Sequence, residues 1–265
     1  MTKLEQYYNK FHEEHRLTTR HGIVEFKTTL SLILDCVQKI KNQKNKENSQ
    51  IRIADIGAGT GRYSIELCHM GFDVTAVELV KHNLDILRAK HENIKTWQGN
   101  AMDLSFLDDE VFDITLVFGP LYHLHGDENK LKALQEARRI TKKDGFILIA
   151  YVMNEYSVIT YCFKEHKMSE VLNKNGISKD YHILTTDEDL YDYVRLDDID
   201  RLNKKASFIR EDIASADGPS DYMRRELNQM SEDEFAEFLK FHMATCRRPE
   251  LLGAGSHIVD VVKKI

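Results

Sequence analysis

Between residues 51 and 151, short apolar runs alternate with longer segments in which apolar side chains recur at helical spacing. The apolar runs predict strands at 51–56, 73–77, 94–97, 112–118 and 146–151, and the segments between them predict helices at 63–70, 81–91 and 127–142. Strands that alternate with helices form βαβ units, in which the helix carries the chain back so that successive strands run parallel. The sequence therefore predicts an α/β fold, with a mostly parallel sheet and helices on both faces.

The flanking segments have weaker patterns. Before the alternating region, apolar spacing predicts a helix over 22–40, and the stretch 41–50 lacks apolar side chains and is expected to be a solvated loop. The stretch 152–190 has little strand character. It either completes the core as a helical excursion or covers the carboxyl ends of the strands as a lid. The elements expected after it are a helix at 189–203, a strand at 206–213, a helix after the capping box at Ser231, and a strand at 256–262.

The charge balance argues against a protein built to bind nucleic acid. Lys and Arg together number 37 and Asp and Glu 43, which gives a net charge of −6, whereas a surface that grips phosphate backbones normally has a basic excess. The four cysteines are scattered, as is usual in a reducing compartment. No stretch has the apolar pattern of a signal peptide or a membrane span. We therefore expect a cytoplasmic protein without a membrane partner.

A glycine-rich turn joins the first strand to the first helix of the alternating region. Residues 55–61 read D-I-G-A-G-T-G, and such a turn lets the backbone pass close to a ligand at a helix N-terminus. The dinucleotide pattern G-x-G-x-x-G would need glycine where this chain has Arg62, and the Gly-Lys-Ser/Thr of a P-loop is absent. Asp55 would repel a pyrophosphate but suits an ammonium group. The turn therefore favours a ligand that carries an ammonium group and no phosphate.

Glu78 stands at the end of the second predicted strand. An acidic side chain at this point accepts hydrogen bonds from both hydroxyl groups of a ribose. The alternative is a solvated carboxylate at a strand end. Because the glycine turn precedes it in the correct structural context, the ribose contact is favoured.

These motifs resemble the class I methyltransferases, in particular the small-molecule type 11 group. The resemblance is carried by the glycine turn, by Val77-Glu78, and by residues 99–104 followed by Phe112-Asp113. It implies a Rossmann-like sheet of seven strands whose last two form an antiparallel hairpin. It also implies S-adenosylmethionine as cofactor and S-adenosylhomocysteine as product. The cofactor contacts that it implies are Asp55, Gly57, Ala58, Gly59, Gly61, Glu78, Leu79, Asn100, Ala101, Met102 and Phe118. The family often has an acidic residue at the position of Asn100, and asparagine keeps a carbonyl acceptor for the adenine amino group.

The N-terminal part resembles a bacterial subgroup of this family in which a helical cap covers the cofactor. On this likeness, residues 1–50 form a helical cap and linker, and residues 51–265 form the methyltransferase domain with a lid-like insertion at about 152–190. Tyr8, His21 and Thr28 are then expected at the cofactor pocket. Arg16 and Glu25 are expected to form an ion pair within the cap.

The motif G-P-L-Y-H-L at residues 119–124 follows the fourth strand and is expected beside the methyl group to be transferred. Gly119 lacks the side chain with which amino-methylating DNA enzymes accept a hydrogen bond from the target amine. His123 is the predicted base because histidine titrates near neutral pH, and Tyr122 is predicted to orient the cofactor or the acceptor. Two alternatives stay open: His123 is an ordinary packing residue, and His257 faces the acceptor.

These features favour an enzyme that moves a methyl group to an oxygen, nitrogen or sulfur atom of a small molecule by in-line displacement. An RNA-modifying methyltransferase would need a basic rim, and the only support for such a rim is the Lys and Arg clusters at 41–46, 142–143 and 247–248. A non-catalytic binder of S-adenosylmethionine is the third possibility, because a fold does not prove turnover. No residues have the spacing of a strong metal-ligand set, so no metal is expected. We expect a monomer or a homodimer.

Overall fold

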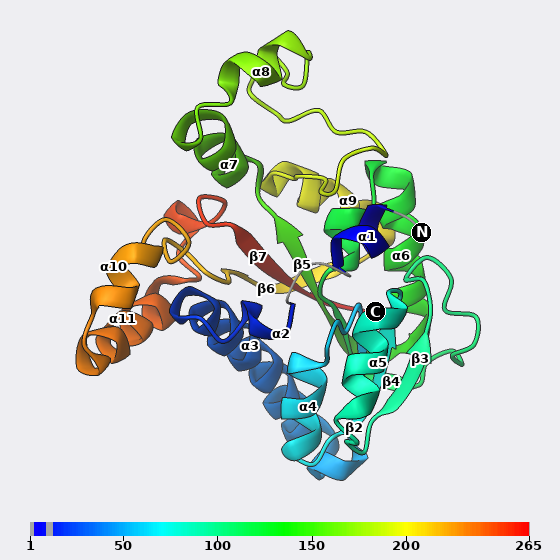
Figure 1. The fold of residues 1–265 in the computed structure, drawn as a ribbon. Coiled ribbons are helices and arrows are strands. Elements are labelled where there is room, and N and C mark those ends of the chain that lie inside the picture. Colours follow the sequence, from blue (N-terminus) through cyan, green and yellow to red (C-terminus); the bar gives the residue numbers. More distant parts are fainter. Residues whose placement is uncertain (1–2, 9–12, 265) are drawn as a thin grey trace.

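The computed structural model describes residues 3–8 and 13–264, and its centre is a seven-stranded sheet (Figure 1). The strands are β1 (Arg52–Ile56), β2 (Asp73–Glu78), β3 (Lys95–Gln98), β4 (Phe112–Val117), β5 (Thr141–Val152), β6 (Ile209–Ser215) and β7 (His257–Lys263). Their spatial order is β3-β2-β1-β4-β5-β7-β6, and β7 alone runs in the direction opposite to the other six strands. The predicted seven-stranded, mostly parallel sheet is therefore confirmed.

Helices connect most of these strands. They are α1 (Lys3–Tyr8), α2 (Glu13–Arg16), α3 (Arg20–Lys44), α4 (Arg62–His69), α5 (Lys81–Ala89), α6 (Gly126–Ile140), α7 (Asn154–Ser157), α8 (Met168–Asn173), α9 (Leu196–Ala206), α10 (Arg224–Gln229) and α11 (Glu232–Thr245). Short 3-10 turns occupy Asn48–Gln50, Pro120–His123 and Pro249–Leu251, and a π-helical turn occupies Val158–Lys164.

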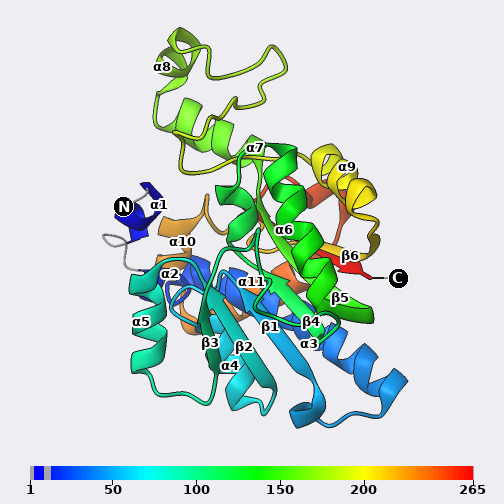
Figure 2. The ribbon, with the colours of Figure 1, turned by 90° about the vertical axis from the view of Figure 1, so that its right-hand side faces the viewer.

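Two hydrophobic cores hold helices against the two faces of the sheet (Figure 2). On one face, Ile33 of α3 and Leu67 of α4 are fully buried against the central strands. On the other face, Leu134 of α6 and Leu202 of α9 are buried in the same way. Because successive side chains of a strand point to opposite faces, a strand that is covered on both faces is buried along its whole length. This explains why β4 has no exposed residue.

The strand order reverses between β1 and β4. The chain leaves β1 toward β2 on one side, whereas β4 lies on the other side of β1 and leads toward β5. The loops that follow β1 and β4 therefore diverge and leave a crevice at the carboxyl ends of these strands. Open α/β sheets bind ligands at this kind of switch point.

Several predicted boundaries differ from the structure. Residues 41–44 were predicted as loop but are the last turn of α3, because a solvated helix turn needs no apolar residue. The helix ends at Asn45, whose φ of 49° is left-handed. Likewise, α9 continues to Ala206 and ends at Ser207 (φ 57°), so the strand predicted from 206 begins at Ile209. The last two strands are antiparallel neighbours but do not form a tight hairpin, because α10 and α11 lie in their connection.

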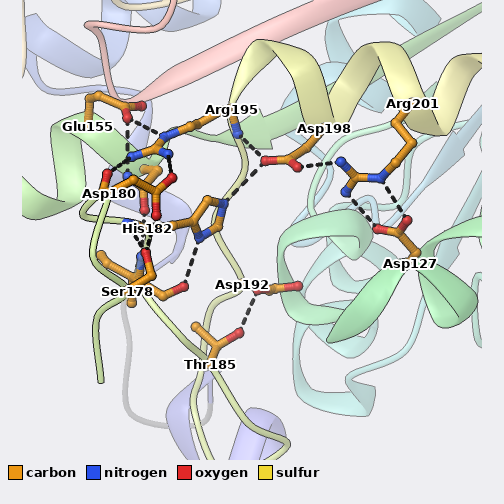
Figure 3. Close-up of polar contacts among 12 residues, drawn as sticks. Asp127, Glu155, Ser178, Asp180, His182, Thr185, Asp192, Arg195, Asp198 and Arg201 are labelled. Carbon is orange, nitrogen blue, oxygen red and sulfur yellow. Dashed lines mark hydrogen bonds and ion pairs between the residues drawn. The ribbon is translucent and has the colours of Figure 1, made fainter. Parts of the chain in front are cut away.

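The insertion between β5 and α9 contains α7, the π-helical turn, α8 and an irregular segment at 174–195, which we call the return segment. The insertion projects away from the sheet (Figures 1 and 2). Charged side chains tie the return segment to α9 (Figure 3). Arg195 binds Glu155 (2.6 Å) and Asp180 (2.7 Å). Asp198 accepts a hydrogen bond from the Arg195 backbone N–H (2.8 Å) and lies 3.2 Å from Nε2 of His182.

Candidate active site

A cavity of about 310 Å³ lies at the carboxyl ends of β1, β2 and β4, and we call it the cofactor cavity. It brings together residues that are distant in sequence but were predicted to act together. The predicted residues that line it are Asp55, Gly57, Ala58, Gly59, Glu78, Leu79, Asn100, Ala101, Met102, Phe118, Tyr122, His123 and Tyr8.

The glycines of the turn after β1 are required by backbone geometry. Gly57 has a φ of +81°, and a Cβ atom there would lie 2.5 Å from the ring of Pro120. Gly61 has a φ of +89° and precedes α4, and a Cβ atom there would lie 2.3 Å from the side chain of Leu87. Gly61 was predicted as a cofactor contact, but it does not line the cavity. Its place is in the turn that starts α4.

Glu78 is buried at the end of β2 and fixes the shape of the turn. Its carboxylate accepts hydrogen bonds from the backbone N–H groups of Gly59 (2.8 Å) and Val80 (2.7 Å). Burial raises the pKa of Glu78, and these two hydrogen bonds oppose the rise. The carboxylate also lines the cavity, so it is placed both to hold the glycine turn and to face a ligand.

Asn83, at the start of α5, is a cavity residue that the sequence analysis missed. It is 2% exposed, and its Oδ1 atom has no hydrogen-bond partner among the described residues. A buried acceptor without a partner costs free energy unless a ligand supplies a donor. A polar residue beside the buried Leu84 and Leu87 of an amphipathic helix was the signal in the sequence.

Asp55 is completely buried below the same turn. Burial raises its pKa to about 6, although the Ser64 hydroxyl group donates a hydrogen bond to it at 2.6 Å. The carboxylate is therefore mostly ionised at neutral pH, in a place where a cationic group of a ligand would relieve the cost of its burial.

Asn100 and Met102 form the far wall of the cofactor cavity. The Oδ1 atom of Asn100 accepts a hydrogen bond from the Met102 N–H group at 3.0 Å. The Asn100 side-chain oxygen, which was expected to meet an adenine amino group, thus also stabilises the turn that Asn100 forms with Met102. A carbonyl oxygen has two lone pairs, so a second contact is possible there.

Besides Gly61, two residues predicted to contact the cofactor, Thr28 and His21, do not line its cavity. Thr28 is buried within α3, where its hydroxyl group donates to the Val24 carbonyl oxygen at 2.8 Å and faces Met243 of α11. His21 lies beside Asp221, with Nε2 at 3.9 Å from the nearest carboxylate oxygen. The structure therefore does not bring His21 and Thr28 to the glycine turn, because they face Asp221 and Met243 in the segment around α10 and α11.

His123 is held by contacts on both ring nitrogens. Its Nδ1 atom lies 2.8 Å from the Leu190 carbonyl oxygen, and its Nε2 atom lies 2.9 Å from the Tyr8 hydroxyl group. Because a carbonyl only accepts, the neutral ring carries its proton on Nδ1, and Nε2 accepts from Tyr8. Burial lowers the pKa of His123 to about 4. The predicted base is therefore neutral at physiological pH, and its basic nitrogen is already engaged.

A second cavity of about 280 Å³ adjoins the first, and we call it the tyrosine cavity. Tyr8, Arg16 and Tyr122 line both cavities. Seven tyrosines from four stretches of the chain form the wall: Tyr7, Tyr8, Tyr122, Tyr156, Tyr161, Tyr191 and Tyr193. The sequence analysis named only Tyr8 and Tyr122 for the site, because no local pattern brings such distant stretches together.

Ion pairs form the polar side of the tyrosine cavity. Arg16 binds Glu25 at 2.8 and 2.9 Å, the geometry expected for the predicted ion pair. His257 lies 2.8 Å from Asp217 and 3.9 Å from Glu25. Burial alone would lower the pKa of His257, but the Glu25 and Asp217 carboxylates raise it to about 9. His257 is therefore a cation that lines the tyrosine cavity, and whether it faces the acceptor stays a prediction.

Glu25, Asp217 and His257 have ligand atoms within 4.8 Å of one another, a spacing that a metal ion could use. Two facts oppose that use. Glu25 already holds the Arg16 guanidinium group, and the Nδ1 atom of His257 faces Asp217 as a hydrogen-bond donor. The cluster is thus neutralised by its own cations, and the absence of a metal stays a prediction.

The glycine turn after β1, the acidic residue that ends β2 and the cavity between them define an α/β domain that binds a nucleoside-type ligand. Residues 54–149 match the family model described as "Methyltransferase domain". These residues therefore belong to the methyltransferase-domain family that the sequence motifs resemble, a family whose cofactor is S-adenosylmethionine.

Individual relatives agree with this family. A demethylmenaquinone methyltransferase of Renibacterium salmoninarum is 29% identical over 119 residues, which are 45% of this chain and 45% of that protein. A glycine/sarcosine N-methyltransferase of Aphanothece halophytica is 28% identical over 109 residues, which are 39% of this chain and 41% of that protein. The chain thus spans less than half the length of these relatives.

A solved structure extends the likeness in fold beyond the matched domain. An S-adenosylmethionine-dependent methyltransferase of Thermotoga maritima, described as a possible histamine N-methyltransferase, has a TM-score of 0.58 at 20% identity. The match covers 99% of this chain and 98% of that one. In the described part of the chain, every helix is too short or too polar to cross a bilayer.

Proposed function

We propose that this protein is an S-adenosylmethionine-dependent methyltransferase whose acceptor is a small molecule bound in the tyrosine cavity. The observation that carries the proposal is the shared wall of Tyr8, Arg16 and Tyr122 between the two cavities. A group in the tyrosine cavity lies directly beside the end of the cofactor cavity. In-line transfer requires this adjacency of donor and acceptor sites.

The residues of the cofactor cavity fit this cofactor in three respects. Glu78 offers carboxylate oxygens for the ribose hydroxyl groups, Asp55 offers a buried negative charge for the ammonium group, and Asn83 offers an unpartnered acceptor. When bound, S-adenosylmethionine supplies the methyl group: its sulfur–carbon bond breaks as the bond from the acceptor atom forms, and S-adenosylhomocysteine remains.

Tyr8 and His123 orient the acceptor. Tyr8 lines both cavities, and its hydroxyl group is fixed by the hydrogen bond to Nε2 of His123, so we expect the acceptor to lie against it. His123 is then a positioning residue, since its low pKa makes it a poor proton acceptor at neutral pH. The proton that the acceptor loses passes to solvent, and His257 is a cation that contributes charge to the cavity wall.

The acceptor atom stays open among oxygen, nitrogen and sulfur. The two relatives above differ in the acceptors that their names give. The cytoplasmic location, the state as monomer or homodimer, and the division into a 1–50 cap and a 51–265 domain also stay predictions.

A small acceptor is favoured over RNA because basic residues in the three clusters form ion pairs within the protein. Lys46 and Lys142 both pair with the buried Asp113, and Arg247 pairs with Asp212 at 2.7 Å. Cations neutralised in this way contribute little to phosphate binding. The tyrosine cavity, by contrast, has the size and the mixture of aromatic and polar groups of a small-molecule site.

The test has a binding part and a transfer part. Calorimetry with S-adenosylmethionine should show binding that Glu78→Gln weakens at least tenfold, because one charged acceptor is lost. Glu92→Gln is the matched control, since Glu92 pairs with His69 at 2.9 Å outside the cavity. Methyl-labelled cofactor is then incubated with fractions of a metabolite extract. A labelled product identifies the acceptor, whereas cofactor binding without any transfer would favour a non-catalytic binder. Equal affinity of Glu78→Gln and Glu92→Gln for S-adenosylmethionine would refute the ribose contact of Glu78.

A further inference from the structure

A third cavity lies inside the insertion, and we call it the insertion cavity. Its volume is about 410 Å³. It shares Tyr161, Tyr191 and Tyr193 with the tyrosine cavity. Among the described residues, it shares none with the cofactor cavity. The three cavities therefore follow one another, with the tyrosine cavity in the middle.

The wall of the insertion cavity combines aliphatic and aromatic side chains with a few polar ones. Val171 of α8 and Ile183, Leu184 and Leu190 of the return segment contribute aliphatic surface. Three lining residues are charged, and all three are exposed: Glu170 and Lys174 pair with each other at 2.8 Å, and Asp189 accepts hydrogen bonds from Thr186. A cavity with aliphatic and aromatic walls that adjoins the tyrosine cavity suits the body of a ligand rather than its reacting group.

The return segment that lines this cavity is anchored to the rest of the fold (Figure 3). Next to Leu184, the Thr185 hydroxyl group donates to Asp192, which also binds the buried Lys130 of α6. At the start of α9, Arg195 binds Asp180 and Asp198 contacts His182, so the part of the segment before Leu184 is held as well. Such a network makes the cavity a built feature of the fold, because each carboxylate in it is matched by a donor.

We propose that the insertion cavity is a second acceptor subsite, which takes an apolar body attached to the group that is methylated. The proposal rests on the proposed function, and it names the acceptor as a molecule with two parts. Its reacting polar head lies in the tyrosine cavity beside Tyr8 and Tyr122, and its hydrocarbon or aromatic body passes Tyr161, Tyr191 and Tyr193 into the insertion. A polar acceptor without such a body would leave the insertion cavity unused.

The experiment measures binding as a function of chain length. The probes are n-alkylamines and n-alkanethiols of three to nine carbons, titrated by calorimetry into the full chain saturated with S-adenosylhomocysteine. Each methylene that enters the cavity should tighten binding about fourfold, the equivalent of about 0.8 kcal/mol. We expect this gain over at least three successive methylenes, for the amines, the thiols or both. The stoichiometry should be one bound probe molecule for each protein chain.

A pair of neighbouring variants tests the location. Val171→Phe fills the insertion cavity and should abolish the gain with chain length. Leu172→Phe is the matched control, because Leu172 follows in the same helix but is 55% exposed and does not line the cavity. Should Val171→Phe disturb the insertion, as judged by thermal unfolding, Leu184→Ser removes apolar wall at a half-exposed position. It should lower the gain per methylene at least twofold.

The outcomes separate this inference from the proposed function. Affinity that does not depend on chain length, or an equal response of Val171→Phe and Leu172→Phe, would overturn the second subsite, whether or not the protein transfers methyl groups. Chain-length dependence that disappears in Val171→Phe supports the subsite even when the probes are not methylated. Failure to bind S-adenosylmethionine would instead refute the proposed function. In that case the probes can still be titrated into the protein without S-adenosylhomocysteine.

Discussion

The hydroxyl oxygen of Tyr8 lies 2.9 Å from Nε2 of His123, and Nδ1 of the same ring lies 2.8 Å from the carbonyl oxygen of Leu190. These two contacts join the N-terminal segment, the loop after β4 and the end of the insertion. The three segments meet where the cofactor and tyrosine cavities adjoin. Tyr8 is thus held in place by a residue that the sequence analysis predicted as the base.

Removing the Tyr8 hydroxyl group should impair transfer more than binding. We expect Tyr8→Phe to lower kcat about tenfold to a hundredfold, with the affinity for S-adenosylmethionine within about threefold of wild type, because the lost oxygen orients the acceptor. Steady-state kinetics on the acceptor found by labelling and calorimetry with the cofactor measure the two effects. Tyr181→Phe is the control, since Tyr181 is 54% exposed and outside both cavities. An unchanged kcat in Tyr8→Phe would rule out the positioning role.

The buried charge of Asp55 should lower the free energy of unfolding at neutral pH. Its pKa is raised to about 6, so its burial penalty is absent below the unfolded pKa of 3.8 and fully present above pH 6. We expect Asp55→Asn to stabilise the fold by about 1–3 kcal/mol at pH 7.5 and by little at pH 4. It should also weaken binding of S-adenosylmethionine. Urea unfolding at both pH values and calorimetry check this, and a variant that loses stability at pH 7.5 would contradict it.

His257 should contribute a pH-dependent part of the stability. Its pKa of about 9 in the folded protein lies above the ordinary histidine value of 6.5. The stabilisation is therefore complete below pH 6.5 and is lost as the pH rises through 9. The difference in unfolding free energy between wild type and His257→Gln should fall by up to about 3 kcal/mol between pH 6 and pH 9.5. Comparing the two proteins cancels the titration of other groups, and a constant difference over this range would show that the cation is not held by Glu25 and Asp217.

Chelation should leave the enzyme unaffected. Glu25, Asp217 and His257 balance one another with Arg16, so we expect no loss of methyl transfer after dialysis against a chelator and no metal by elemental analysis. Transfer that disappears on chelation and returns with one divalent ion would reassign this cluster as a metal site. Glu25→Gln would then be expected to lower the affinity for that ion.

Local patterns were sufficient for the cofactor side of the site. The order of strands and helices predicted the parallel sheet, and the glycine turn and Glu78 stand at the ends of neighbouring strands. Parallel strands bring their carboxyl ends to one edge, so residues at these ends meet whatever the details of packing. His21 and Thr28 do not line the cofactor cavity, because the rotation of α3 about its axis is decided by packing against α10 and α11, which local spacing does not specify.

The glycine turn, Glu78 and the alternation of strands and helices were determined by the sequence itself, because each depends on residues close together in the chain. The tyrosine wall, the pairing of Tyr8 with His123 and the charged state of His257 were decided only by the tertiary structure. They arise where the N-terminal segment, the loop after β4, the insertion and the start of β7 converge. Contacts over such separations leave no periodic trace in the sequence, and the pKa of a side chain depends on the neighbours that folding supplies.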